Sequence, residues 1–227
     1  DREMSGVLRL GRVLWWSINT LAPDVRRRAG DESGPHTIAE AASMYLNRDR
    51  NKWLWHLPLA EIPDEVLSEM GTHWRNWLHD HTSDHFNFIS KHQEIDVPAL
   101  TTTGWYDQQI GAIKNFTGMR ENARTSEARR GQKLIIGPWS HTIDFSSSRV
   151  GVMDFGPESV MDFVQIADDW FGHWLKKEDT GVNEWPPIRI FVMGSNTWRY
   201  ESEWPLSRAR YTNYYLHNIN TTNHQTS

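Results

Sequence analysis

Two short apolar runs, residues 97–103 and 133–136, constrain the fold of this chain more than any other feature. Both runs are rich in apolar or β-branched residues, and their length and composition predict buried strands rather than helices. The segment between them predicts a helix over about residues 108–122. Two strands joined by a helix of this length predict a parallel βαβ unit.

A carboxylate and an imidazole follow directly after the two expected strands. Asp107 ends the segment 104–107, and His141 ends the segment 137–141. Parallel strands finish at the same edge of a sheet, and α/β proteins place ligands and catalytic groups at that edge. We therefore expect the two side chains to lie within hydrogen-bond reach. The acid precedes the histidine, as in a serine-hydrolase triad with the chain order Ser, Asp, His.

An acid and a histidine in contact can perform acyl transfer together. The neutral imidazole removes the proton of an attacking serine and returns it to the leaving group, while the carboxylate fixes the tautomer. The alternative is an ion pair at the strand ends without chemistry. The position of Asp107 and His141 at consecutive strand ends favours catalysis. Asp144 also lies close to His141 in sequence, but its loop position favours surface capping.

Three separated motifs resemble the family of cocaine esterase and X-Pro dipeptidyl-peptidase acyl hydrolases. They are GWYD at 104–107, IIGPWSH at 135–141 and IRIFVMGSNTWRYESEWP at 188–205, and the resemblance extends over about residues 80–216. The resemblance implies an α/β-hydrolase domain, a helical cap inserted before the acid, and a C-terminal β jelly roll. The family needs no metal or cofactor. Its nucleophile lies in a Gly-x-Ser-x-Gly elbow before the cap, and the 227 residues contain no such motif.

The resemblance also implies roles for individual residues. Asp107 is the implied triad acid and His141 the implied general base. Trp105, Tyr106 and Trp139 flank them, and the resemblance implies that residues at these positions border an acyl or aromatic substrate pocket. Each of these aromatic side chains could instead pack between the sheet and the cap.

The expected fold class is α/β, with four segments along the chain. Residues 1–92 are expected to form an all-helical cap over the carboxyl edge of the strands, because apolar residues recur there at helical spacing. Residues 93–185 are expected to be the C-terminal part of the hydrolase domain, and 186–217 the start of the jelly roll. Residues 218–227 are polar and expected to be disordered.

Within these segments, the pattern predicts individual helices and strands. One amphipathic helix is expected from Ser5 to Asn19, broken over Thr20 to Pro23, and further helices are expected over 37–48 and 64–78. Pro186 and Pro187 predict a domain junction. The strands expected beyond them cover 188–193 and 211–216.

The segment 79–85 contains three histidines and two aspartates. His81 and His85 are four residues apart, with Asp80 and Asp84 interleaved, a spacing and ligand set that zinc accepts. The alternative is a turn in which Thr82 or Ser83 caps a short helix. The HExxH pattern of zinc hydrolases is missing from the sequence, so we expect no metal site.

Composition limits the function classes. The net charge of −5 does not indicate a basic surface for binding a nucleic acid. The sequence contains no run of 18 apolar residues, so it does not predict a membrane span. The absence of cysteine and of a signal-peptide pattern favours a cytoplasmic location. The first residue is not Met and lies in a helical pattern, which indicates a piece of a longer protein. The expected partner is therefore the missing N-terminal half.

These observations predict part of a serine-dependent acyl hydrolase, of the esterase or X-Pro dipeptidyl-peptidase type. The chain would supply Asp107 and His141, and its substrate would be a small ester or a short peptide. The sequence leaves open which of the two, and also the oligomeric state. The alternative function is a non-catalytic helical interaction module on a degenerate hydrolase half.

Overall fold

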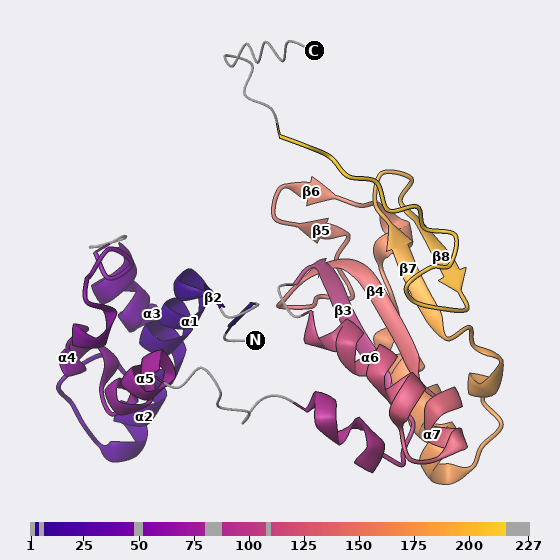
Figure 1. The fold of residues 1–227 in the computed structure, drawn as a ribbon, viewed down its shortest axis with the longest axis horizontal. Coiled ribbons are helices and arrows are strands. Elements are labelled where there is room, and N and C mark those ends of the chain that lie inside the picture. Colours follow the sequence, from indigo (N-terminus) through magenta and orange to yellow (C-terminus); the bar gives the residue numbers. More distant parts are fainter. Residues whose placement is uncertain (1–2, 5–6, 48–51, 80–87, 108–109, 217–227) are drawn as a thin grey trace, which may run out of the picture. The chain divides into compact units, whose positions relative to one another are not determined.

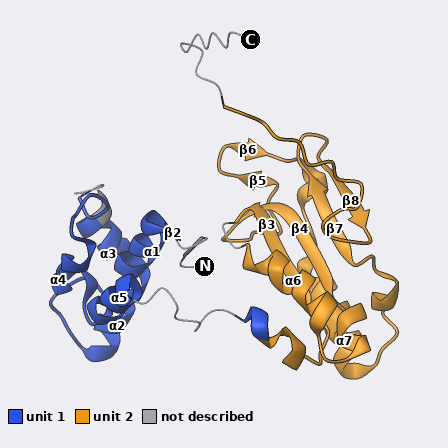
Figure 2. Cartoon of the chain, viewed as in Figure 1, with its two compact units in different colours: residues 1–90 blue, residues 91–227 orange. Residues whose placement is uncertain are grey.

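A computed structural model describes residues 3–4, 7–47, 52–79, 88–107 and 110–216. The chain divides into two compact units, residues 1–90 and 91–227, and each is described by itself (Figure 2). The candidate metal ligands at 80–85 and the tail at 218–227 lie outside the described residues. Among the described residues, no group of three or more His, Cys, Asp or Glu side chains is arranged to hold a metal ion.

Unit 1 begins with a small two-stranded ribbon instead of a helix. Strands β1 (Glu3–Met4) and β2 (Val7–Leu8) pair antiparallel, and helix α1 (Leu10–Trp16) follows. The expectation that residues 1–92 are all helical is therefore wrong at the N-terminus. The prediction of a helix from Ser5 rests on the helical spacing of the apolar residues from Val7 onward.

The helix that starts with α1 continues through Pro23, where a break was expected. A π-helical turn, η1 (Ser17–Leu21), joins α1 to α2 (Ala22–Ala29), and Pro23 lies in the first turn of α2. Proline has no N–H to donate, and the wider bonding of a π-helical turn just before it lets the chain continue in helical form. Gly30, with φ of 65°, then ends α2 in the left-handed conformation that glycine adopts without strain.

The other two helices expected in unit 1 are confirmed in outline. Helix α3 (Ile38–Ala41) continues as the π-helix η2 (Ala42–Asn47), and Thr37 and Glu40 form a capping box at its start. The expected helix over 64–78 consists of α4 (Asp64–Leu67) and α5 (Met70–His79), separated at Ser68, where φ is 54°. A 3-10 turn, η3 (Leu59–Glu61), precedes them.

The core of unit 1 is formed by the inward faces of these helices. Its buried members are Val13, Leu14, Ile18, Trp53, Ile62, Val66, Leu67, Met70 and Trp74. Arg26 is also buried at 1% exposure, and it donates to the backbone carbonyl of Glu65. The polar contact therefore links α2 to α4 inside the unit.

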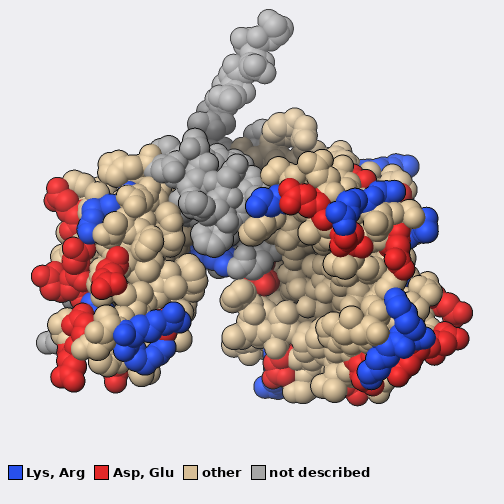
Figure 3. Space-filling view, turned by 90° about the horizontal axis from the view of Figure 1, so that it is seen from below, with Lys and Arg blue, Asp and Glu red and all other residues tan. Residues whose placement is uncertain are grey.

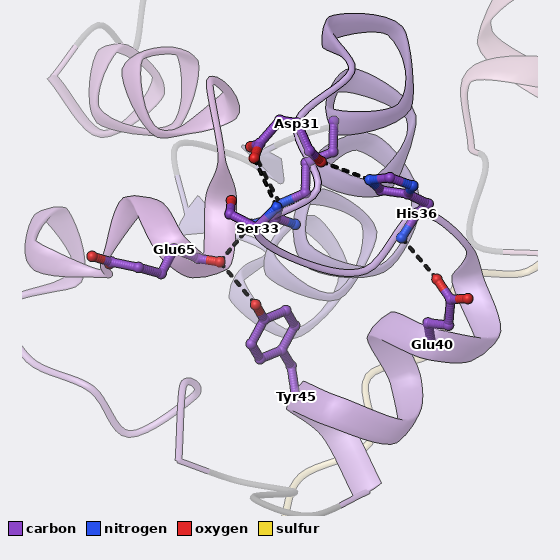
Figure 4. A network of polar contacts seen from close by, with 7 residues as sticks. Asp31, Ser33, His36, Glu40, Tyr45 and Glu65 are labelled. Atoms are coloured by element: carbon purple, nitrogen blue, oxygen red, sulfur yellow. Dashed lines mark hydrogen bonds and ion pairs between the residues drawn. The ribbon is translucent and has the colours of Figure 1, made fainter.

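Polar contacts also hold the loop between α2 and α3 (Figure 4). The side chain of Asp31 accepts hydrogen bonds from Ser33, which hold the pKa of this carboxyl below its ordinary value. The backbone N–H of His36 donates to Glu40 at 2.8 Å and lowers the pKa of that carboxyl in the same way. The hydroxyl of Tyr45 donates to the carbonyl of Glu65 at 2.8 Å. These bonds satisfy loop and helix-end groups, and they support a structural role for the network.

Unit 2 is built on a mixed sheet with the strand order β3-β4-β7-β8 (Figure 1). Strands β3 (Leu100–Tyr106), β4 (Lys133–Ser140) and β7 (Ile188–Val192) run parallel, and β8 (Thr197–Glu201) pairs antiparallel with β7. Helices α6 (Gly111–Asn122) and α7 (Ser126–Arg130) connect β3 to β4. The predicted βαβ unit is therefore confirmed.

The remaining elements of unit 2 lie before β3 and between β4 and β7. A 3-10 segment, η4 (Ile89–Glu94), begins in the last two residues of unit 1 and leads into β3. After β4 come the hairpin β5 (Arg149–Val150) and β6 (Met153–Asp154), the turn η5 (Pro157–Ser159) and helix α8 (Phe163–Phe171). Helix α8 continues as η6 (Gly172–Lys176), and η7 (Val182–Glu184) precedes β7.

Alternating residues of β4 build a core on each face of the sheet. Leu134 and Ile136 pack with Phe116 of α6 on one face. Ile135 and Trp139 lie in the second core cluster, which includes Phe163 and Ile166 of α8. Because successive strand residues point to opposite faces, α6 and α8 cover opposite sides of the sheet. No described helix has both the length and the apolar character needed to cross a bilayer.

Of the two strands predicted to begin a separate β domain, the structure contains one. The strand expected at 188–193 is present as β7, but it starts directly after Pro187 and joins the same sheet as β4. Proline lacks a backbone N–H. Because both prolines precede the strand, every N–H group within the strand stays available for hydrogen bonds to its neighbours. The strand expected at 211–216 is wrong, because these residues form no helix or strand and Tyr211, Tyr214 and Leu216 are exposed. Strand β8 pairs with β7 instead.

Candidate active site

Asp107 and His141 are in contact, as their positions in the βαβ unit predict. The Nδ1 atom of His141 lies 3.1 Å from Oδ1 and 3.3 Å from Oδ2 of Asp107. The side chain of Asp107 is 8% exposed and that of His141 is 71% exposed. The carboxylate is therefore buried while the imidazole is accessible. With Nδ1 bonded to the carboxylate, Nε2 is the nitrogen available for proton transfer.

A β-bulge in β4 brings this pair into register. Gly104 of β3 lies opposite Gly137 of β4, but Tyr106 lies opposite Ser140, so β4 contains one extra residue in this interval. Without the extra residue, Asp107 would lie opposite Ser140. The bulge places His141 opposite Asp107 instead. Bulges commonly redirect a side chain in this way beside an active site.

Two motif glycines make room for the bulge. A Cβ atom on Gly104 would lie 2.0 Å from the carbonyl oxygen of Trp139, and a Cβ atom on Gly137 would lie 2.5 Å from the Trp139 ring. Sequence analysis did not single out these glycines. An isolated glycine within a strand is typical of a bulge or a close backbone approach, and that signal was present in both motifs.

We expect Gly104→Ala to destabilise unit 2 by about 1–3 kcal/mol, the usual cost of forcing extra atoms into a packed site. The added Cβ meets backbone rather than a flexible side chain, so the bulge must shift and the Asp107–His141 contact should open. Urea unfolding and amide hydrogen exchange of β3 and β4 measure this effect. Gly11→Ala is the control, because it lies in α1 with nothing within 4 Å of the added Cβ. Unchanged exchange in Gly104→Ala would contradict the proposed role of this glycine.

The three aromatic residues predicted to border a pocket have different surroundings. Trp105 donates from Nε1 to the carbonyl of Phe191 at 2.7 Å, and its ring lies 6.4 Å from that of Trp204. It packs against the core on the α6 face. Tyr106 is 47% exposed next to Asp107, so it is the most exposed of the three.

Trp139 has a packing role. Its side chain is 1% exposed, and its ring contacts Phe145 edge-to-face at 4.7 Å and Trp198 at 5.9 Å. A side chain enclosed in this way has no surface to present to a substrate. The structure therefore does not support the expected pocket role for Trp139, and it agrees with the packing alternative.

Asp144 and Ser140, the other polar residues near His141 in sequence, have local partners. Asp144 accepts hydrogen bonds from the backbone N–H of Ser146 at 2.9 Å and from its hydroxyl at 2.7 Å. These bonds lower the pKa of the Asp144 carboxyl and agree with the expected surface capping. The hydroxyl of Ser140 lies 3.4 Å from the carbonyl of Thr142. Within the described residues, Asp107 is thus the carboxylate bonded to His141.

Comparison with known families assigns the chain. Residues 4–143, which include both Asp107 and His141, match the model of the X-Pro dipeptidyl-peptidase (S15) family. The chain belongs to this family. Residues 180–227 match a second model, described as the X-Pro dipeptidyl-peptidase C-terminal non-catalytic domain.

One curated protein and one solved structure are similar to this chain. Cocaine esterase from Rhodococcus sp. (strain MB1 Bresler) is 31% identical over 172 residues, which cover 70% of this chain and 27% of that protein. An aminopeptidase structure from the marine sediment archaeon Thaumarchaeota archaeon shares the fold, with a TM-score of 0.54 at 18% identity. That match covers 90% of this chain and 32% of the aminopeptidase. The chain therefore spans about a third or less of the relatives it matches.

Proposed function

We propose that this chain supplies the acid and the base of a Ser-Asp-His triad in a serine-dependent acyl hydrolase. The observation that carries the proposal is the 3.1 Å contact between Asp107 and His141 at the carboxyl ends of adjacent parallel strands. The family includes esterases and X-Pro dipeptidyl-peptidases, which supports acyl transfer as the reaction class. The nucleophile comes from outside these 227 residues, because they contain no Gly-x-Ser-x-Gly elbow.

The proposed mechanism uses both nitrogens of His141. Asp107 accepts the Nδ1 hydrogen, which leaves the lone pair of Nε2 free to take the proton of the serine hydroxyl as it attacks the acyl carbonyl. The imidazolium that forms is stabilised by the buried carboxylate. It then donates the Nε2 proton to the leaving alcohol or amine. Water enters the same cycle in the second half-reaction, and its proton passes to Nε2 before the serine leaves.

We propose a small ester or a short peptide as the substrate. Tyr106 is the side chain of this chain that we assign to substrate contact, since it is exposed and adjacent to the triad acid. Unit 1 is proposed to be the helical cap of the hydrolase. Residues 186–217 are proposed to begin the C-terminal jelly roll, and the match of 180–227 to the non-catalytic domain supports this assignment.

The second candidate function is a non-catalytic interaction module, which the missing elbow motif favours. Labelling with a fluorophosphonate serine probe separates the two candidates. We expect no labelling of the chain alone, and full labelling of a chimaera in which it replaces the matching segment of cocaine esterase. Hydrolysis of p-nitrophenyl acetate should follow the same pattern.

Two results would overturn these expectations. Stoichiometric labelling of the chain alone, mapped to one of its own serines, would show that it contains the nucleophile. A folded chimaera that keeps the esterase serine but neither reacts with the probe nor hydrolyses the ester would favour the interaction module.

A further inference from the structure

Unit 2 contains a pocket of about 560 Å³ at the amino ends of its parallel strands β3, β4 and β7. Asp107 and His141 follow the carboxyl ends of β3 and β4, so a full strand length, roughly 20 Å, separates the pocket from the candidate triad. A volume of this size is typical of sites that bind small molecules. The middle of unit 2 seen in Figure 3 is mainly uncharged, with charged side chains along its margins.

The strand register explains how the pocket floor forms. Leu100 lies opposite Lys133, Ile135 opposite Arg189, and Arg189 opposite Tyr200. Directly opposite residues share a face, so these side chains form two adjacent rows on the face covered by α8, one of Leu100 and Lys133 and one of Ile135, Arg189 and Tyr200. Ile166 of α8 and the Trp185-Pro186 segment complete the lining. The pocket therefore combines an apolar surface with two cationic side chains.

Arg189 is a cation without a hydrogen-bonded acceptor at its Nε atom. Its guanidinium carbon lies 4.6 Å from the ring centre of Trp198 and 5.7 Å from that of Tyr200. Its Nε atom is buried, and among the described residues it has no hydrogen-bond partner. A buried unsatisfied donor costs stability, and more so on a charged group. Arg189 as a whole is only partly buried and lines the pocket, so a ligand carboxylate would pair with its guanidinium group, the preferred partner of carboxylates.

Lys133 adds a second positive charge to the pocket. It is 7% exposed, and its ammonium group donates to the carbonyl of Trp185. Burial lowers the pKa of Lys133, and the nearby charge of Arg120 lowers it further. The described residues that line the pocket include no carboxylate. An anionic ligand would therefore meet uncompensated positive charge there.

We propose that this pocket binds a small carboxylic acid with an apolar body, whose carboxylate pairs with Arg189 and whose body packs on Leu100, Ile135 and Ile166. The two cations select a negative charge, and the apolar floor selects a hydrocarbon or aromatic group over a hydrated ion such as phosphate. The site is separate from the candidate triad and does not depend on the proposed acyl hydrolysis.

Calorimetric titration of the purified chain with benzoate tests this proposal, with benzamide as the uncharged analogue of the same shape. We expect saturable binding of benzoate and binding of benzamide at least about 10-fold weaker, since a charge-assisted hydrogen bond contributes about 10- to 100-fold in affinity. Arg189→Gln should weaken benzoate binding by a similar factor.

Arg199→Gln is the matched control. Arg199 lies opposite Ile190, so it is on the other face of β8, and it pairs with Glu201. This variant should bind benzoate as the unaltered chain does. Absence of saturable benzoate binding, or equal affinity for benzamide, would overturn the proposal. If Arg189→Gln does not fold, the comparison of benzoate with benzamide on the unaltered chain still decides the question.

Discussion

Replacement of His141 by alanine is expected to lower kcat about a million-fold in the cocaine esterase chimaera that carries this chain. Without the imidazole, no group removes the serine proton during attack, and loss of the triad histidine alone has an effect of about 10⁶ in a well-studied serine hydrolase. Asp107→Asn should lower kcat about 10⁴-fold, because the amide holds His141 in the wrong tautomer. Initial rates with p-nitrophenyl acetate measure both effects, and KM should change far less.

Asp144→Asn provides the matched control for Asp107→Asn. Asp144 is the other carboxylate close to His141 in sequence, but its side chain is bonded to Ser146. We expect its replacement to leave kcat within a few-fold of the unaltered chimaera. An equal loss of kcat in Asp144→Asn and Asp107→Asn would remove the basis for assigning the triad acid. A His141→Ala chimaera that retains full activity would remove the basis for the triad itself.

The sequence predicted the contact between Asp107 and His141 because the determinants of this contact are local or follow from sheet topology. Two short apolar runs and a connecting helix require a parallel βαβ unit, and that unit alone brings the residues after both strands to one edge. The sequence alone therefore predicts that Asp107 and His141 lie together. The family motifs added the proposed roles of Asp107 and His141 but did not explain Gly104 and Gly137.

The bulge could not be predicted from the pattern of apolar residues. Its register shift depends on the close approach of Gly104 to the Trp139 carbonyl, a contact between two strands. Strand residues alternate between faces, so a shift of one residue changes which partner Asp107 meets. Alternation also places Trp139 on the α8 face, but only its neighbours Phe145 and Trp198 show that it is enclosed. Sequence proximity to His141 therefore gave a misleading indication for this residue.

The pairing of β7 with β4 also depends on contacts between residues that are far apart in the sequence. The apolar run at 188–192 predicts a strand wherever it pairs, and the preceding prolines favoured a new domain. In the structure, Ile188 and Ile190 are buried together with Leu134 and Ile136 of β4. The hydrophobic free energy gained by burying these side chains favours extension of the existing sheet. Tertiary packing thus decides which strand β7 pairs with.

Trp139→Ala is expected to destabilise unit 2 by about 3–5 kcal/mol, the usual cost of removing a large aromatic side chain from a core. Trp139 is 1% exposed and joins Phe145 and Trp198 in one aromatic cluster, so its removal leaves a cavity lined by the other two rings. Urea unfolding of the chain measures the change. Hydrogen exchange of the β4 amides, followed in parallel, assigns it to unit 2.

Trp139→Phe separates packing from a specific role of the indole. The Nε1 atom of Trp139 is buried and has no hydrogen-bond partner among the described residues, so phenylalanine removes an unsatisfied donor and leaves a smaller cavity. This variant should therefore cost clearly less than Trp139→Ala. Phe171→Ala is the control within the same unit, since Phe171 is 55% exposed and should cost about 0.5 kcal/mol or less. If Trp139→Ala left stability unchanged but raised KM in the chimaera, Trp139 would be a substrate contact and the packing assignment would be wrong.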